Sequence, residues 1–192
     1  HAGKVGAGHY TKMVHNGIEY GLMAAYAEGY ELLMKKDIVE DVPGAFKAWS
    51  RGTVVRSWLL DLMVDALEKN PGLEGVSDYT VDSGEGKWTV EEAIALDVPM
   101  PVISSSLFAR FASRQAISPT MQAVSALRGE FGGHQVMTIA EGDALRVGKA
   151  AKPAVAAAAK KATSVSTAKK AAAPATKKRA AAKKAAQKKT DA

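Results

Sequence analysis

Four side chains near the start of the sequence have the chemistry and the spacing of a catalytic site. They are an amine, an imidazole, an amide and a carboxylic acid: Lys12, His15, Asn16 and Glu19. On an α-helix these positions fall within an arc of about 100°, because each residue advances the helix by about 100°. One helix face would then present a base, an acid and two groups that can orient a substrate. We therefore predict a functional site on a helix that begins near Gly8.

The same face has a plainer interpretation, in which charges at helical spacing form a solvated surface with a Glu–Lys pair. Two observations favour the functional one. Gly17 and Gly21 lie inside the helix, where each costs about 1 kcal/mol relative to Ala, which indicates close packing against the backbone. His15 and Asn16 are poor helix formers with no reason to gather on a solubilising face. On the opposite side we expect four apolar residues to be buried: Met13, Val14, Ile18 and Leu22.

Most of the remaining sequence up to residue 148 is predicted to form helices, since few stretches alternate as strands do. The Pro-Gly pair at 43–44 predicts a turn, and Thr53 is the expected cap of the following long helix. Residues 71–88 are rich in Gly, Asp and Ser, which favours a loop. Thr89 with Glu92 three residues later has the pattern of a capping box. We expect an all-α fold of five to seven helices, including 8–35, 45–51, 54–70, 89–98, 101–112 and 119–128.

The positive net charge comes entirely from the end of the chain. Residues 149–192 hold 13 of the 26 lysines and arginines and one of the 20 acidic residues, so they carry +12, whereas residues 1–148 carry −6. The final segment consists almost wholly of Ala, Lys, Pro, Thr and Ser and has no aromatic residue to build a core. We predict a helical domain over residues 1–148 and a disordered Lys/Ala/Pro-rich tail over residues 149–192.

Composition narrows the class of protein further. The chain has no cysteine, which excludes disulfides and thiolate chemistry. Its apolar runs are shorter than the 18 or so residues that span a bilayer, and no signal peptide is visible, so we expect a cytoplasmic protein without a membrane partner. The histidines lack an accompanying set of carboxylate or thiolate ligands, so no metal site is predicted. Because the chain begins at His1, we expect a fragment or a processed product.

Several motifs occur in the order that they have in one enzyme family. They are Gly-x-Gly at 6–8, KMVHNGIEY at 12–20, GKWT at 86–89, Phe-Ala-Arg at 108–110, and Arg128-x-x-Phe-Gly-x-His134. In this order they resemble the C-terminal domain of decarboxylating 6-phosphogluconate dehydrogenase, in its short form. The resemblance covers about residues 3–140.

The resemblance implies oxidative decarboxylation of 6-phosphogluconate to ribulose 5-phosphate, a step of the pentose phosphate pathway and of gluconate utilisation, with NAD or NADP as cofactor. Lys12 would act as the general base that takes the proton from the C3 hydroxyl. Glu19 would act as the acid that protonates C1 of the enediol left after loss of carbon dioxide. His15 and Asn16 would orient the hydroxyls and the carboxylate.

The resemblance also implies how the phosphate and the neighbouring subunit take part. Tyr20 and Arg110 would bind the 6-phosphate, Arg110 through its planar fork of donors. Arg128 and His134 would reach into the active site of a second subunit. The expected assembly is therefore a homo-oligomer, either a dimer or a tetramer, in which subunits share site residues.

Two departures from the family pattern stand out. Ser83 and Glu85 occupy positions where longer members carry Lys and Thr, and Glu85 would repel a phosphate if it pointed inward. The sequence also lacks a Gly-x-Gly-x-x-Gly strand–helix unit. The N-terminal dinucleotide-binding domain is thus predicted to be absent. Since that domain would bind most of the cofactor, the isolated chain is expected to be inactive.

Other interpretations stay open beside the enzyme. The chain could be a nucleic-acid-tethered binding protein driven by its basic tail, because such tails attract nucleic acid or polyphosphate regardless of sequence. It could also be a catalytically dead fragment that retains only assembly. Arg110 could be an ordinary surface arginine and His134 an ordinary loop residue. Trp88 is expected in the core.

Overall fold

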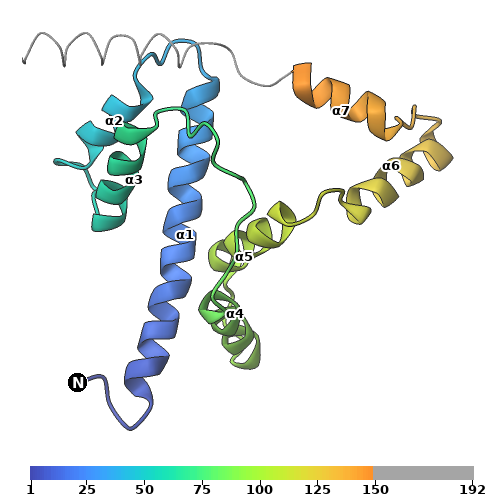
Figure 1. Ribbon diagram of the computed structural model, residues 1–192. Coiled ribbons are helices and arrows are strands. Elements are labelled where there is room, and N and C mark those ends of the chain that lie inside the picture. The colour runs from blue at the N-terminus through green and yellow to red at the C-terminus, as the bar shows by residue number, and fades with distance from the viewer. Residues whose placement is uncertain (149–192) are drawn as a thin grey trace, which may run out of the picture. The chain divides into compact units, whose positions relative to one another are not determined.

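A computed structural model describes residues 1–148, and the predicted disordered tail lies outside the described residues. Within them the secondary structure is entirely helical, which confirms the all-α prediction (Figure 1). None of the described helices is both long and apolar enough to cross a membrane. The seven helices are α1 (Ala7–Lys35), α2 (Val42–Trp49), α3 (Trp58–Lys69), α4 (Glu85–Ala95), α5 (Pro101–Ser113), α6 (Pro119–Gly132) and α7 (Ile139–Gly148).

Helix α1 is the longest element, and α2, α4 and α5 all pack against it. Its buried residues lie on one stripe: Asn16, Gly17, Tyr20 and Gly21. The prediction of a buried apolar face is wrong for Ile18 and Leu22, which are 52% and 42% exposed, whereas Met13 and Val14 are half-buried. The two glycines let α4 and α5 approach on the polar side instead, so the face that carries chemistry is also the packed one.

The C-terminal half of α1 packs with α2 and α3 around a cluster of Val42, Phe46, Leu60, Val64 and Leu67. Both helices begin where a side chain caps them, and neither start matches the prediction. Asp41 Oδ1 accepts from the amide of Gly44 at 2.8 Å, so the predicted turn at 43–44 is the first turn of α2. Ser57 Oγ accepts from the amide of Leu60 at 3.0 Å, so Ser57 and not Thr53 caps α3.

A second cluster joins α1, α4 and α5 through Tyr20, Val90 and Leu107. The predicted loop over 71–88 is too long, because α4 already begins at Glu85. Gly84 precedes it with φ of 97°, a left-handed conformation that favours glycine. The predicted cap Thr89 lies inside α4 and is buried. Its Oγ1 lies 2.9 Å from the carbonyl oxygen of Met13 on α1 and 2.8 Å from that of Glu85.

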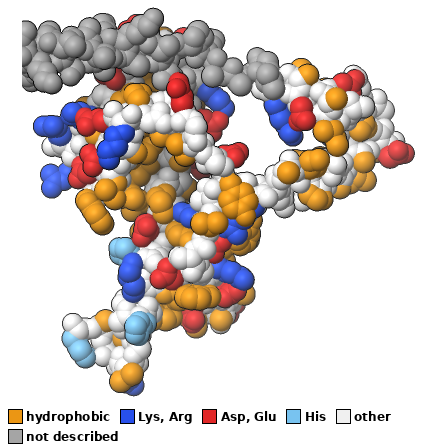
Figure 2. Space-filling model, in the orientation of Figure 1, with side chains coloured by type: hydrophobic (Ala, Val, Ile, Leu, Met, Phe, Trp, Pro, Cys, Tyr) orange, Lys and Arg blue, Asp and Glu red, His pale blue; other side chains and the backbone are white. Residues whose placement is uncertain are grey.

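Helices α5 and α6 begin at Pro101 and Pro119 as predicted, and Gly133 ends α6 in a left-handed conformation with φ of 62°. Helix α7 was not predicted, although Thr138 and Glu141 form the capping box that signals it, with reciprocal bonds of 2.7 and 3.3 Å. Helix α6 buries no side chain. Hydrophobic side chains gather at the surface of this part of the chain (Figure 2), including Met121, Val124, Leu127 and Phe131.

The contact between α1 and α4 can be tested at Gly17. A Cβ added there would lie 2.7 Å from Thr89 Cγ2, so we expect Gly17→Ala to lower the free energy of unfolding by about 1–3 kcal/mol. Gly29 on the same helix has no neighbour within 4 Å of an added Cβ. Gly29→Ala is the matched control, and should raise the free energy of unfolding by up to about 1 kcal/mol. Urea unfolding measures both, and equal effects would contradict the proposed close approach.

Candidate active site

The N-terminal half of α1 brings three of the four predicted residues into mutual contact. Lys12 Nζ donates to Asn16 Oδ1 and lies 3.3 Å from His15 Nδ1. His15 Nδ1 in turn lies 3.2 Å from Asn16 Oδ1. Asn16 is 9% exposed, whereas Lys12 and His15 reach the surface. Glu19 lies one turn further along α1, half-buried, and takes no part in these three contacts.

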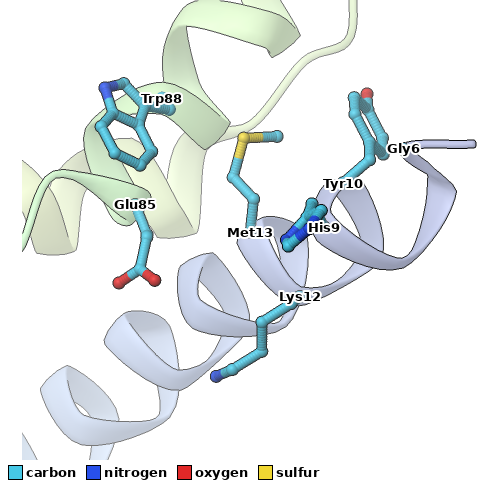
Figure 3. A pocket seen from close by; sticks show the side chains of 7 residues that line it. All are labelled: Gly6, His9, Tyr10, Lys12, Met13, Glu85 and Trp88. Carbon is cyan, nitrogen blue, oxygen red and sulfur yellow. The ribbon is translucent and has the colours of Figure 1, made fainter.

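Beside this cluster, α1 and α4 enclose a pocket of about 400 Å³ (Figure 3). Lys12 and Glu85 line it from the two helices, with their charged ends turned to the same side of the view. Met13 and Trp88 give it an apolar wall, and Gly6, His9 and Tyr10 complete its lining. Trp88 is 53% exposed and belongs to this wall, so its expected place in the core is wrong. A pocket with an amine, a carboxylate and an aromatic wall suits a small polar ligand.

Glu85 is the charged residue that sequence analysis did not place in the site. The hydroxyl of Ser83 donates to its carboxylate at 2.7 Å. This bond, the Asn16 amide and the positive charge of Lys12 together hold the pKa of Glu85 below its usual value. The lowered pKa favours the ionised carboxylate, and Glu85 lines the same pocket as Lys12.

Tyr20 and Arg110, predicted as a pair, do come together. The guanidinium carbon of Arg110 lies 3.7 Å from the centroid of the Tyr20 ring, at cation–π distance. Arg110 Nη1 donates to the carbonyl oxygen of Val81 at 2.9 Å, and the amide of Ser83 donates to the Tyr20 hydroxyl at 3.3 Å. A Cβ on Gly86 would lie 2.5 Å from Tyr20, so glycine allows α4 to approach this ring. Arg110 is thus half-buried and held against Tyr20 and Val81.

An ion pair fixes the turn that precedes α4. Arg114 Nη2 donates to Asp82 Oδ2, and Arg114 Nε donates to the carbonyl oxygen of Thr80 at 2.9 Å. Asp82 Oδ1 also accepts from the amide of Gly84 at 3.2 Å. The guanidinium beside it keeps the pKa of Asp82 below its usual value. No spacing rule could have found this pair, because its members are separated by more than thirty residues in sequence.

Arg128 and His134 are not brought to this site. Among the described residues, no hydrogen bond, ion pair or ring contact joins either of them to Lys12, Tyr20 or Arg110. Their own contact is local, since the amide of His134 donates to the carbonyl oxygen of Arg128 at 3.4 Å. Arg128 lies in α6, which buries no side chain, and His134 follows the residue that caps the end of this helix.

Comparison with known proteins gives one family. Residues 8–159 match the family model described as 6-phosphogluconate dehydrogenase, C-terminal domain. A putative 6-phosphogluconate dehydrogenase of Bacillus subtilis is 46% identical over 134 residues, which are 70% of this chain and 45% of the relative. The NAD(+)-dependent, decarboxylating 6-phosphogluconate dehydrogenase of Haloferax volcanii is 44% identical over 137 residues, 71% of this chain and 46% of the relative.

A more distant similarity extends to longer proteins. The decarboxylating 6-phosphogluconate dehydrogenase of Lactococcus lactis subsp. cremoris is 40% identical over 121 residues, 58% of this chain and 25% of the relative. An NADP(+)-dependent, decarboxylating 6-phosphogluconate dehydrogenase of Bacillus subtilis is 39% identical over 121 residues, with the same coverage. The chain spans about half the length of the first two relatives and about a quarter of these longer ones.

The Asp82–Arg114 pair predicts a pH dependence of stability. Because the folded state lowers the pKa of Asp82, the stabilisation is present at neutral pH and is lost as the pH falls through the folded pKa. We expect Asp82→Asn to lower the free energy of unfolding at pH 7, and the gap to the parent to narrow as the pH falls below about 4 and to close below the folded pKa of Asp82. Asp78→Asn, on the same loop, is the control and should change little at either pH. A gap independent of pH would show that the ion pair contributes nothing.

Proposed function

The chain belongs to the family of the 6-phosphogluconate dehydrogenase C-terminal domain, and we propose that residues 1–148 form the substrate-binding and proton-transferring half of such an enzyme. The reaction would be oxidative decarboxylation of 6-phosphogluconate to ribulose 5-phosphate. The observation that carries the proposal is the cluster of Lys12, His15 and Asn16 beside the pocket. The cluster belongs to the family motif at residues 12–20, and its amine, imidazole and amide can bind and deprotonate a polyol.

Proton transfer is assigned to two ionisable groups of α1, Lys12 within the cluster and Glu19 one turn beyond it. Lys12 takes the proton from the C3 hydroxyl as the substrate is oxidised to a 3-keto acid. That acid loses its carboxylate as carbon dioxide and leaves an enediol. Glu19 then protonates C1, which completes the ketose. His15 and Asn16 provide an imidazole and an amide that can hold the substrate hydroxyls and carboxylate in place.

Binding of the 6-phosphate is assigned to Tyr20 and Arg110. Stacking on the Tyr20 ring and the bond to Val81 orient the guanidinium, which supports a role in positioning an anion. The ionised Glu85 lines the pocket beside Lys12. It would repel the phosphate, which would instead be attracted to the guanidinium of Arg110. A substrate with a negative charge at one end would thereby be aligned.

The nicotinamide cofactor, NAD or NADP, is required for the oxidation and supplies the acceptor of a hydride. The described residues do not fit a dinucleotide, because residues 1–148 contain no strand from which a Gly-rich strand–turn–helix could begin. We assign most of the cofactor binding to a separate dinucleotide-binding domain. The choice between the two cofactors therefore stays open, and so does the predicted cytoplasmic location.

A second subunit would complete the site. Helix α6 leaves its apolar side chains Leu127 and Phe131 exposed, which suits burial against another copy of the chain. Such an assembly would let Arg128 and His134 reach the neighbouring site, as the resemblance implies. The assembly would then be part of the catalytic machinery.

A second candidate function concerns residues 149–192. Their charge of +12 against −6 for residues 1–148 favours attraction to a polyanion such as nucleic acid or polyphosphate. This function is compatible with the enzyme, which the tail would tether.

The catalytic assignment predicts the behaviour of two variants in the protein that includes the proposed dinucleotide-binding domain. Lys12→Met and Glu19→Gln should each lower kcat with 6-phosphogluconate by about 10²–10⁴-fold, because each removes a proton-transfer group. Lys35→Met and Glu31→Gln change the exposed ion pair on the same helix and should keep parent activity. Nicotinamide reduction at 340 nm with carbon dioxide release measures the effect. If both site variants kept parent activity, the role of α1 would be structural and the catalytic assignment would be wrong. If the parent itself were inactive, the result would favour a catalytically dead protein that retains only assembly.

Shared sites predict recovery of activity in mixed oligomers. Homo-oligomers of Lys12→Met and of Arg128→Ala should both be impaired. Hybrids of the two should regain activity, because one site then combines Lys12 of one subunit with Arg128 of the other. The two variants are coexpressed with different tags and the hybrid is purified through both. A hybrid no better than the mean of its parents would place Arg128 outside the neighbouring site.

Tethering predicts salt-sensitive binding of duplex DNA at low salt. The complete chain should bind with an affinity that falls steeply as salt rises, and residues 1–148 alone should not bind. Fluorescence anisotropy with a labelled duplex compares the two chains. A flat curve for the complete chain would remove nucleic acid as a partner.

A further inference from the structure

Two residues at the start of α4 line the pocket, and neither binds the substrate in the proposed mechanism. Glu85 is the first residue of α4, and Trp88 belongs to the GKWT motif. Trp88 is 53% exposed, although tryptophan is on average one of the more buried residue types. Both residues line the pocket from α4, whereas Lys12 and Met13 line it from α1 (Figure 3). The α4 side therefore offers an aromatic ring and a carboxylate to a ligand.

The indole of Trp88 is held against the turn that precedes α4. A Cβ added to Gly84 would lie 3.2 Å from Trp88 Cζ2, so the ring packs directly against this glycine. The amide of Trp88 also donates to the carbonyl oxygen of Gly84 at 2.9 Å. The ring is thus fixed on one side by the turn, while about half of the residue stays accessible. It gives the pocket an apolar surface in a defined place.

The carboxylate of Glu85 is restrained by the same turn. The Ser83 hydroxyl donates to Glu85 Oε2 at 2.7 Å. Ser83 directly follows Asp82, which is paired with Arg114 and accepts from the amide of Gly84 at 3.2 Å. A carboxylate has about four sites that can accept a hydrogen bond, so Glu85 keeps the capacity to accept from a ligand.

The chemistry of the two side chains selects one part of a sugar acid. An ionised carboxylate accepts hydrogen bonds and does not donate them, so Glu85 favours a ligand group that donates. It repels the phosphate and carboxylate ends of the substrate, whereas the hydroxyls between those ends are neutral donors. Trp88 and Met13 offer apolar surface to the carbon atoms that carry these hydroxyls.

We propose that Glu85 and Trp88 form a polyol subsite, which binds the hydroxylated carbon chain of the substrate across the pocket from Lys12. Glu85 accepts a hydroxyl hydrogen, and Trp88 packs against the carbon chain. The inference deepens the proposed function, on which it rests, by assigning substrate contacts to α4. Neither residue transfers a proton. A second attachment besides the phosphate restricts rotation of the chain, and thereby helps to present the C3 hydroxyl to Lys12.

A titration of the chain as it stands tests the contact without reference to catalysis. Gluconate is the probe, because it has the hydroxylated chain and lacks the phosphate. ¹H–¹⁵N NMR follows the indole N–H signals of the three tryptophans. The Trp88 signal should shift, while that of Trp58, which is 78% exposed on α3, should stay in place.

The same spectra separate the subsite from the function on which it rests. If the backbone amide signals around Lys12 shift and the Trp88 signal does not, the polyol subsite is wrong and the proposed function stands. If neither gluconate nor 6-phosphogluconate shifts any signal, the proposed substrate-binding role of residues 1–148 is wrong, and the subsite is wrong with it.

The sign of the effect of Glu85→Ala decides between binding and repulsion. If Glu85 accepts a hydroxyl hydrogen, the Kd for gluconate should rise by about tenfold or more, as expected for a lost bond to a charged group. Glu85→Gln keeps an acceptor oxygen and should lose less. Glu91→Ala alters a side chain that is 57% exposed on the same helix and should leave the Kd unchanged. A Kd that falls or stays constant in Glu85→Ala would mean that the carboxylate only repels anions, and would overturn the proposal.

The indole is tested in the protein that includes the proposed dinucleotide-binding domain. Trp88→Ala should raise the KM for 6-phosphogluconate by about three- to tenfold, because apolar surface against the carbon chain is lost. Trp88→Phe keeps an aromatic ring and should remain within about twofold of the parent. Trp58→Ala is the matched control for an exposed tryptophan and should keep the parent KM. An unchanged KM in Trp88→Ala would overturn the role of the indole.

Discussion

The close crossing of α1 and α4 is the constraint on which the rest of the site depends. Gly17 on α1 leaves room for Thr89, and Gly86 on α4 leaves room for Tyr20, so the two backbones approach at two successive points. The buried hydroxyl of Thr89 lies within hydrogen-bond distance of a carbonyl oxygen on each helix. Neither helix could be shifted along the other without breaking this contact, and Glu85 is therefore carried to Lys12.

Polar residues at a helix crossing are stable only when each finds a partner, and the structure meets this condition with two short series of contacts. One joins Lys12, His15 and Asn16 on α1, and the other runs from Glu85 through Ser83 and Tyr20 to Arg110. No buried side-chain nitrogen or oxygen among residues 1–148 lacks a hydrogen-bond partner. The proposed base Lys12 and the proposed phosphate ligand Tyr20 both lie on α1.

Sequence reasoning succeeded where the cause of a feature is local. Proline starts α5 and α6, and the spacing of Lys12, His15 and Asn16 puts them on one face. It failed where a distant contact overrides a local pattern. Thr89 has the sequence pattern of a helix cap, but its hydroxyl instead lies at hydrogen-bond distance from the Met13 carbonyl oxygen on α1.

Ile18 and Leu22 on α1 were predicted to be buried but are exposed, because glycines let the partner helices pack on the other side of α1. Glu85 could not be placed by spacing, because it is far from Lys12 in the sequence and only folding brings the two side chains to one pocket. The pairing of Tyr20 with Arg110 was found only through the resemblance.

The length of α1 has a mechanical consequence. Lys12 lies near the N-terminal end of α1. Near its C-terminal end, Tyr30 and Leu33 pack against the cluster of α2 and α3. At 1.5 Å per residue, Lys12 lies roughly 27 Å along the axis from Tyr30. A tilt of about 5° at the gripped end would swing the amine by about 2 Å, far more than the roughly 0.5 Å tolerance of a catalytic group. The rigidity of the cluster formed with α2 and α3 therefore limits how far the Lys12 amine can move.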